Sequence, residues 1–309
     1  MPPRVWNLVH HKAIPLDRPI LIAILNLTPD SFSDGGNLPS SDAAARAAAE
    51  AIRDGAHMLD IGGESTRPGA ARIPADEQIR RVVPAIQAIR KQNPDIPISV
   101  DTTLAAVADA ALDAGADAVN DVAAGLEDVD MLPLVARRGA GMILMHRLRT
   151  PDRDRFSDQY RSLPQYPAPG GVVGAVTDFL SGRAGNAIAA GIDPSRIVLD
   201  PGLGFGKSVQ QNLELIHNTP QLSALGFPVL SALSRKSFTA RAAGLGPDTP
   251  PKSRVDASLG LSVAHLCRGA SLFRVHDVRP HHEALTAAWS AISPGFQSEP
   301  YRTSPFSAR

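Results

Sequence analysis

The chain has 309 residues, of which 43% are hydrophobic and 20% are charged, the composition of an ordinary globular protein. Its 31 lysines and arginines balance its 31 aspartates and glutamates, so no long-range basic field favours nucleic acid or an anionic membrane. A single cysteine, Cys267, excludes an intramolecular disulfide framework and a zinc site with several cysteines. We expect Cys267 to be a small, buried apolar residue.

No apolar run approaches the ~20 residues that span a bilayer. Residues 1–12 lack the apolar segment of a signal peptide. These features, together with the low cysteine content, predict a soluble, cytoplasmic protein.

Short apolar runs alternate with helix-like stretches along the chain. We expect strands at residues 20–26, 57–61, 98–101, 118–121, 141–146, 197–200, 229–233 and 271–275. We expect helices at residues 41–54, 75–92, 131–138, 172–191, 213–225, 253–268 and 279–292, and an alanine-rich helix that ends near residue 115. Eight such units are the number that a barrel needs, whereas an open doubly wound sheet usually has five or six strands. The predicted fold is therefore α/β, a single (β/α)8 TIM barrel.

The barrel is expected to span residues 20–292, after an N-terminal extension at residues 1–19. Residues 147–171 interrupt the repeat, since they are polar, rich in proline and arginine and without helical periodicity. We expect them to form a surface insertion near the rim of the pocket. Residues 293–309 are rich in serine, proline and arginine, which predicts a disordered tail.

Polar side chains close most of the apolar runs. They are Asn26, Asp60, Asp101, Asn120, His146, Asp200, Ser234 to Lys236, and Arg274 to Asp277. In a barrel, the C-terminal ends of all strands face one pocket, which carries the active site. The alternative for any single aspartate or asparagine is that it caps the following helix.

The glycine-rich segment at residues 201–208, PGLGFGKS, is only superficially similar to a nucleotide-binding loop. A Walker A motif needs glycine where Pro201 stands, and the dinucleotide-binding spacing would place its third glycine at Lys207. What remains is a carboxylate, Asp200, beside flexible backbone that a flat ligand can approach closely.

The predicted pocket residues fall into two chemically opposite sets. The hydrogen-bond acceptors, which suit the amino-amidine edge of a planar heterocycle, are Asp101, Asn120 and Asp200. The cations and donors, which suit a phosphate or diphosphate, are Asn26, Lys236, Arg274 and His276. One ligand with a heterocycle at one end and a diphosphate at the other would satisfy both sets.

Two long segments resemble signature segments of the dihydropteroate synthase family: LNLTPDSFSDGG at residues 25–36 and DIGGESTRPG at residues 60–69. Shorter motifs complete the pattern in the family's order: SVDT at 99–102, ND at 120–121, DPG at 200–202, SRKS at 234–237 and RVHD at 274–277. The resemblance spans roughly residues 20–289.

The resemblance implies a transferase of folate biosynthesis. It would condense 6-hydroxymethyl-7,8-dihydropterin diphosphate with p-aminobenzoate to give 7,8-dihydropteroate and diphosphate. The resemblance also implies Mg²⁺ as cofactor, reached through Asn26 and Asp34, and a homodimer that binds small-molecule substrates but no nucleic acid or membrane. The implied catalytic residues are Asn26, Lys236, Arg274 and His276.

The resemblance further implies three subsites under loops that close over the site. The implied pterin-binding residues are Asp101, Asn120, Met145, Asp200, Lys236 and Arg274. The implied p-aminobenzoate-binding residues are Thr66, Arg67, Pro68, Phe205 and Ser237. The implied diphosphate-binding residues are Asn26, Arg274 and His276.

The sequence departs from the family pattern near the pocket. Ala232 stands where the family usually has glycine, and residues 147–151 replace a glycine-containing stretch after His146. Two alternatives remain open. A pterin-dependent methyltransferase barrel would share the acidic positions but would not need the SRKS and RVHD segments. A non-catalytic pterin-binding paralogue would keep the fold, and Ala232 is the feature that suggests it.

Overall fold

The computed structural model describes residues 5–9, 11–27 and 41–293. Within these residues, eight parallel strands form one sheet. The strands are β3 Ile20–Asn26, β4 Met58–Gly62, β5 Ile98–Asp101, β6 Ala118–Asp121, β7 Gly141–Met145, β8 Ile197–Asp200, β9 Leu230–Ser231 and β10 Leu272–Val275. The predicted strands all exist, with ends that differ by at most one residue except at β9, which is three residues shorter than expected.

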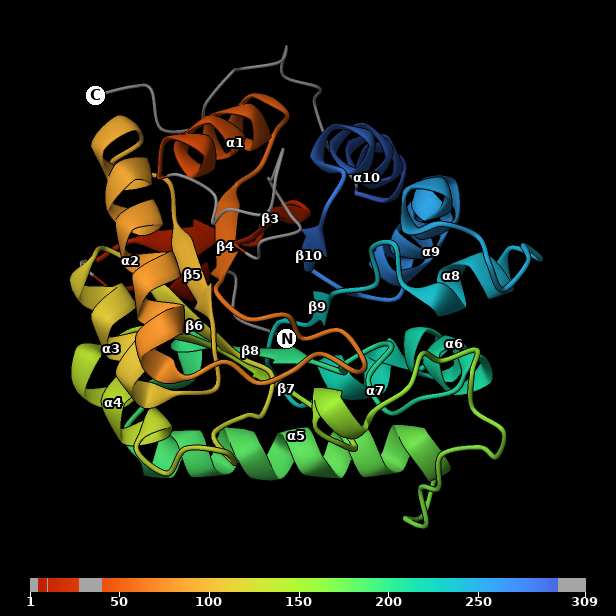
Figure 1. Cartoon of the computed structure of the whole chain (residues 1–309). Helices are drawn as coiled ribbons and strands as arrows, with labels where there is room; N and C mark the ends of the chain where they lie inside the picture. The colour runs from red at the N-terminus through yellow and green to blue at the C-terminus, as the bar shows by residue number, and fades with distance from the viewer. Residues whose placement is uncertain (1–4, 10, 28–40, 294–309) are drawn as a thin grey trace.

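The sheet has the order β8-β7-β6-β5-β4-β3-β10-β9. A parallel bridge between Leu199 and Val229 joins its two edges, β8 and β9, so the sheet closes on itself. Helices surround it, as Figure 1 shows. The predicted (β/α)8 barrel is confirmed.

The outer helices also follow the prediction closely. They are α1 Ser41–Arg53, α2 Ala75–Gln92, α3 Ala105–Asp113, α4 Met131–Arg138, α5 Gly171–Ala189, α6 Val209–His217, α7 Thr219–Ser223, α8 Ser237–Ala242, α9 Val255–Cys267 and α10 Val278–Ile292. The expected helix at residues 213–225 is two helices, because Pro220 lies in the first turn of α7 and its ring nitrogen cannot donate a helical hydrogen bond to α6. The short helix α8 was not predicted.

The N-terminal extension closes one end of the barrel. Its hairpin pairs β1 Val5–Asn7 with β2 Ala13–Pro15. Trp6 and Leu8 are fully buried against apolar residues near the starts of the strands, such as Ile20 and Leu272. The opposite end, where the strands finish, therefore remains for the pocket.

Two expectations about burial need correction. Cys267 is exposed, because the neighbouring His265 and Leu266 occupy the core side of α9. The insertion at residues 147–171 is exposed at most positions, as expected, but Asp154 and Ser157 within it are buried.

Among the described residues, no helix is long and apolar enough to cross a membrane. The predicted tail lies outside the described residues from position 294 onward.

Candidate active site

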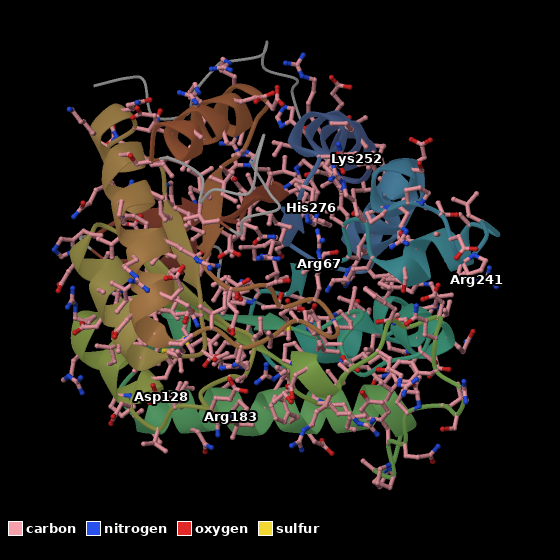
Figure 2. The ribbon with its side chains drawn as sticks, viewed as in Figure 1. Arg67, Asp128, Arg183, Arg241, Lys252 and His276 are labelled. Carbon is pink, nitrogen blue, oxygen red and sulfur yellow. The ribbon has the colours of Figure 1, made fainter. Side chains whose placement is uncertain are left out.

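A cavity of about 290 Å³ lies at the C-terminal end of the barrel strands. Every predicted site residue lines it except Asp34, which lies outside the described residues. These lining residues are Asn26, Thr66, Arg67, Pro68, Asp101, Asn120, Met145, Asp200, Phe205, Lys236, Ser237, Arg274 and His276. Arg67 and His276 lie near the centre of the molecule in Figure 2, whereas Arg241 and Arg183 lie at its periphery. The strand-end rule thus located the pocket.

The strand register brings the acceptor residues to one level. Asp101 pairs with Asn120 between β5 and β6, and Met145 pairs with Asp200 between β7 and β8. Gly62 lies opposite Asp101, and a Cβ at Gly62 would come within 3.3 Å of Asn26 Oδ1. Glycine at this position therefore lets polar groups of neighbouring strands crowd together.

Arg274 joins two buried carboxylates at the floor of the pocket. Its Nε donates to Asp60 Oδ2 over 2.5 Å, and its Nη2 donates to Asp101 Oδ2 over 2.7 Å. Asp60 also accepts hydrogen bonds from Ser99 Oγ (2.6 Å) and from Asn120 Nδ2 (3.1 Å). Asp60 does not line the cavity, so it positions Arg274 and Asn120. Its strand-end location was noted from the sequence, but this supporting role was not.

Asp101 keeps one acceptor for a ligand. Its Oδ1 is buried and has no hydrogen-bond partner in the described part of the chain. Burial raises the pKa of Asp101 to about 7, and the nearby Asp60 adds to this effect, while Arg274 opposes it. Burial also raises the pKa of Asp200, whose Oδ1 accepts from the backbone of Gly202 over 2.7 Å. Both carboxylates therefore gain from a ligand that donates hydrogen bonds.

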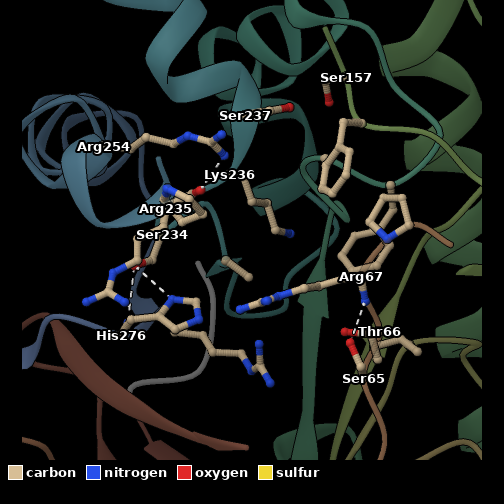
Figure 3. A pocket seen from close by; sticks show the side chains of 18 of the residues that line it. Ser65, Thr66, Arg67, Ser157, Ser234, Arg235, Lys236, Ser237, Arg254 and His276 are labelled. Atoms are coloured by element: carbon tan, nitrogen blue, oxygen red, sulfur yellow. Dashed lines mark hydrogen bonds between the residues drawn. The ribbon is translucent and has the colours of Figure 1, made fainter. Parts of the chain in front are cut away.

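Lys236 extends into the middle of the pocket (Figure 3). Its Nζ donates to the carbonyl of Leu203 and lies 4.2 Å from the centre of the Phe205 ring, a cation–π distance. Burial lowers the pKa of Lys236 to about 7, and Arg274 lowers it further against the opposing effect of Asp200. Gly204 gives the side chain its space, since a Cβ there would lie 2.7 Å from Lys236 Cδ.

His276 is neutral at pH 7. Its ring Nδ1 lies 3.3 Å from Ser234 Oγ, which also accepts from the His276 backbone over 3.1 Å. Burial, together with Arg274 and Arg235, lowers the pKa of His276 to about 3. The sequence left open whether this side chain is a cation or an uncharged donor, and its surroundings decide for the neutral form. Arg235 itself is paired with Asp277 (2.8 Å), so it stabilises the turn before Lys236.

Lys207, to which no structural role was assigned from the sequence, is fully buried. Its Nζ donates to the carbonyls of Phe205 (2.8 Å) and Gly202 (2.9 Å) and lies 3.0 Å from His146 Nδ1. Gly202 has φ of 67°, and a Cβ there would lie 1.8 Å from the His146 carbonyl oxygen. Lys207 and Gly202 therefore hold the glycine-rich loop against the end of β7. The glycine-rich PGLGFGKS segment was the available sequence signal for this loop, but its spacing served to exclude a nucleotide-binding loop and did not indicate a role for Lys207.

Several further lining residues were not predicted. Phe156, Ser157, Asp158 and Gln159 come from the insertion after β7. Arg254 comes from the short 3₁₀ helix Pro251–Arg254 and donates to the Arg235 carbonyl over 3.0 Å. Neither segment ends a strand or carries a motif of the resembled family, so neither the strand-end rule nor the resemblance indicated them.

Comparisons with known proteins agree with this geometry. Residues 22–276 match the family model described as "Pterin binding enzyme". A dihydropteroate synthase from Streptococcus pyogenes serotype M6 is 44% identical over 265 residues, 86% of this chain and 92% of the relative.

Solved structures are similar over the same region. The Xanthomonas albilineans dihydropteroate synthase with 4-aminobenzoic acid has a TM-score of 0.80 and 40% identity, covering 92% of this chain and 96% of that one. The same enzyme in complex with 7,8-dihydropteroate has a TM-score of 0.77 and 38% identity, over 91% and 96% of the two chains. The chain therefore belongs to the pterin binding enzymes and, within them, to the dihydropteroate synthase family of transferases.

Proposed function

We propose that this pocket condenses 6-hydroxymethyl-7,8-dihydropterin diphosphate with p-aminobenzoate, giving 7,8-dihydropteroate and diphosphate. The observation that carries the proposal is Asp101, which lines the cavity and whose buried Oδ1 has no hydrogen-bond partner among the described residues. Arg274 and Lys236 line the same cavity. A ligand with a donor edge and an anionic arm satisfies both features. The solved relatives with 4-aminobenzoic acid and 7,8-dihydropteroate support the choice of ligands.

The acceptor end of the pocket suits the pterin. Asp101 and Asp200 would accept from its amino and ring N–H groups, with Asn120 between their strands. Lys236 would donate to a ring acceptor, and Met145 would pack against the ring. Two carboxylates in a low-dielectric site also favour the electron-poor pterin that forms as diphosphate departs.

The cationic end suits the diphosphate. Arg274 would supply charge, since Asp60 and Asp101 raise its pKa despite its burial, and the neutral His276 would supply an N–H donor. The Asn26 amide oxygen also fits Mg²⁺, which takes oxygen ligands and is held by one or two protein groups plus substrate phosphates. Asp34, the second proposed ligand, lies outside the described residues. When bound, Mg²⁺ would stabilise charge on the leaving diphosphate.

The arylamine would bind between the loop after β4 and the glycine-rich loop. Thr66, Arg67 and Pro68 line the cavity from the first loop, and Phe205 lines it from the second, with Ser237 at the start of α8. No protein nucleophile is required, because the amine attacks the pterin methylene carbon after the C–O bond to diphosphate has broken. The amine then loses a proton. The walls must exclude water, which would compete with this weak nucleophile.

The barrel fold is also compatible with two alternative functions. A pterin-dependent methyltransferase is not favoured, since the relatives described above are named dihydropteroate synthases. A non-catalytic pterin-binding protein is suggested by Ala232, which lines the cavity. A steady-state assay of dihydropteroate formation with both substrates and Mg²⁺ separates the cases. Turnover supports the synthase, whereas pterin binding without turnover, restored by Ala232→Gly, would identify a non-catalytic paralogue.

We also propose a homodimer in the cytoplasm. The resemblance to the family supports the dimer, and the single cysteine suits a reducing compartment. Light scattering on the purified protein tests the dimer, and the mass of one chain at micromolar concentration would contradict it.

A further inference from the structure

Residues 64–73 form the loop between β4 and α2, and residues 65–68 of this loop line the cavity. Glu64 closes the base of the loop, because its Oε1 accepts from the Ile73 backbone over 2.8 Å. The loop is therefore a closed unit, and its position on the rim of the barrel decides where this wall of the pocket stands.

Arg72, near the end of this loop, connects it to two neighbouring segments of the rim. Its Nη1 donates to Glu127 Oε2 over 2.9 Å, and its Nη2 donates to Thr103 Oγ1 over 3.1 Å. Its Nε also lies 3.4 Å from Glu64 Oε1, at the base of the loop. One guanidinium therefore ties the loop to the segments that follow β5 and β6.

Arg147 extends this connection to the start of the insertion after β7. It is paired with Glu127 Oε1, the carboxylate oxygen that Arg72 does not use, and only 8% of its side chain is exposed. Burial acts to raise the pKa of Glu127, but the Thr103 hydroxyl and the two arginines outweigh it and lower that pKa. Glu127 is thus a charged carboxylate shared between the loop and the insertion.

A second contact joins the same two segments. The Gly69 backbone donates to the Pro151 carbonyl over 2.8 Å, and Figure 1 shows the loop after β4 beside the start of the insertion. Arg147 and Pro151 both belong to residues 147–151, the stretch at which the sequence departs from the family pattern. The loop is therefore held near its tip as well as at its base.

We propose that the Arg72–Glu127–Arg147 bridge positions the loop after β4 in the form that completes the arylamine half of the pocket. The three residues are not among those that line the cavity, so they act through residues 65–68. This inference rests on the proposed function, because that function assigns this wall to the arylamine. Only the fraction of molecules with the loop in the binding form takes up the arylamine, so the bridge raises apparent affinity by raising that fraction.

Replacement of Arg147 tests the bridge. Arg147→Met removes the charge and is expected to weaken p-aminobenzoate binding to the protein alone by roughly fivefold. The loss should be smaller with pterin, Mg²⁺ and diphosphate present, because these ligands favour the same form of the loop. Calorimetric titration in both conditions measures the two losses. Equal losses would overturn the proposal, since they would show that Arg147 does not act on the position of the loop.

The pterin provides an internal comparison. Its affinity should be the same in Arg147→Met and in the wild type, because Asp101 and Asp200 lie on strand ends outside the loop. Arg147→Lys, which keeps the charge, should restore part of the arylamine affinity. A parallel loss of pterin and arylamine affinity would contradict a bridge that acts on one wall.

Arg138→Met is the matched control. Arg138 also joins two carboxylates, Asp109 (2.6 Å) and Asp113 (2.5 Å), but it links α4 to α3 and does not contact the loop. It should leave both affinities unchanged, and a loss equal to that of Arg147→Met would overturn the proposal. If Arg147→Met does not fold, Arg72→Met replaces it, because the Arg72 side chain is 37% exposed.

A double variant shows whether the bridge acts as one unit. Glu127→Gln removes the shared charge and should weaken arylamine binding at least as much as Arg147→Met does. The combination of both changes should then lose no more affinity than Glu127→Gln alone, because both break the same bridge. Additive losses would mean that the two residues act independently and would contradict the proposal.

Hydrogen exchange at the Gly69 and Ile73 amides tests the loop without any arylamine. Exchange should be faster in Arg147→Met than in the wild type or in Arg138→Met, and unchanged exchange would overturn the role of the bridge. If the wild-type chain forms no dihydropteroate, the proposed function is wrong, while the exchange rates still test how the loop is held. Product formation together with unaltered exchange and arylamine affinity would leave the function standing and remove only the bridge.

Discussion

Arg274 and Asp101 are joined across 2.7 Å between β10 and β5, strands that are not neighbours in the sheet. The bond uses one carboxylate oxygen of Asp101, a residue that lines the cavity, and leaves the other buried without a hydrogen-bond partner in the described part of the chain. A cation for the anionic end of a ligand and an acceptor for its heterocyclic end are therefore fixed relative to each other before any ligand binds.

This arrangement makes pterin affinity depend on pH. Burial raises the pKa of Asp101 to about 7, and donor groups of a pterin prefer the ionised carboxylate. As pH falls below 7, Asp101 gains a proton, so pterin affinity should fall by about tenfold for each further pH unit. Calorimetric titration between pH 5.5 and 8.5 measures this dependence. Asp101→Asn should bind weakly at all these pH values, and a variant with the wild-type pH profile would contradict the assignment.

Removal of Arg274 should affect stability as well as binding. Arg274→Ala leaves Asp60 and Asp101 buried without their cation. Because breaking a buried ion pair is strongly destabilising, the free energy of unfolding should fall by about 3 to 5 kcal/mol. Diphosphate should also bind more weakly to Arg274→Ala, because Arg274 belongs to the proposed diphosphate end of the pocket. Arg279→Ala is the control, because the Arg279 side chain is largely exposed and its pair with Asp54 should contribute less than about 1 kcal/mol. Urea unfolding of both variants gives the comparison, and equal stability losses would refute the network.

Replacement of Lys207 tests the tether of the glycine-rich loop. Lys207→Met removes the donors to Phe205 and Gly202, so stability should fall by about 1 to 3 kcal/mol and p-aminobenzoate should bind more weakly. Burial lowers the pKa of Lys207 to about 7 from 10.5. Between these pH values the unfolded chain binds a proton that the folded chain does not, so wild-type stability relative to the variant should rise with pH. A difference that is constant from pH 7 to 10 would show that the buried lysine stays charged.

The order of substrate binding should depend on the loop after β4, which carries Thr66, Arg67 and Pro68. Diphosphate with Mg²⁺, held by Asn26, Arg274 and His276, is expected to order this loop and thereby strengthen p-aminobenzoate binding. The expected coupling free energy is about 1 to 3 kcal/mol. Titration of p-aminobenzoate with and without pterin, Mg²⁺ and diphosphate measures that coupling. Thr66→Ala should weaken p-aminobenzoate and spare the pterin. Equal arylamine affinity in the two conditions would contradict an ordered mechanism.

The sequence by itself determined the barrel and about half of the pocket lining. Apolar runs of strand length ended at polar residues such as Asn26, Asp101 and Asp200, and barrel geometry converts a strand end into a position in the pocket. The SRKS and RVHD segments placed Lys236 and His276 there for the same reason. Local patterns also fixed most helix bounds, because helix and strand periodicities are properties of neighbouring residues.

Only the tertiary structure decided which groups are buried together. Asp154 meets Gly206, 52 residues away, and turns a polar insertion into a pocket wall. His276 has a lowered pKa because burial and nearby arginines oppose its protonation. Asp101 holds a spare acceptor because Arg274 takes only one of its oxygens. Desolvation and long-range hydrogen bonds depend on what packs around a group, and that information does not lie in the residues next to it along the chain.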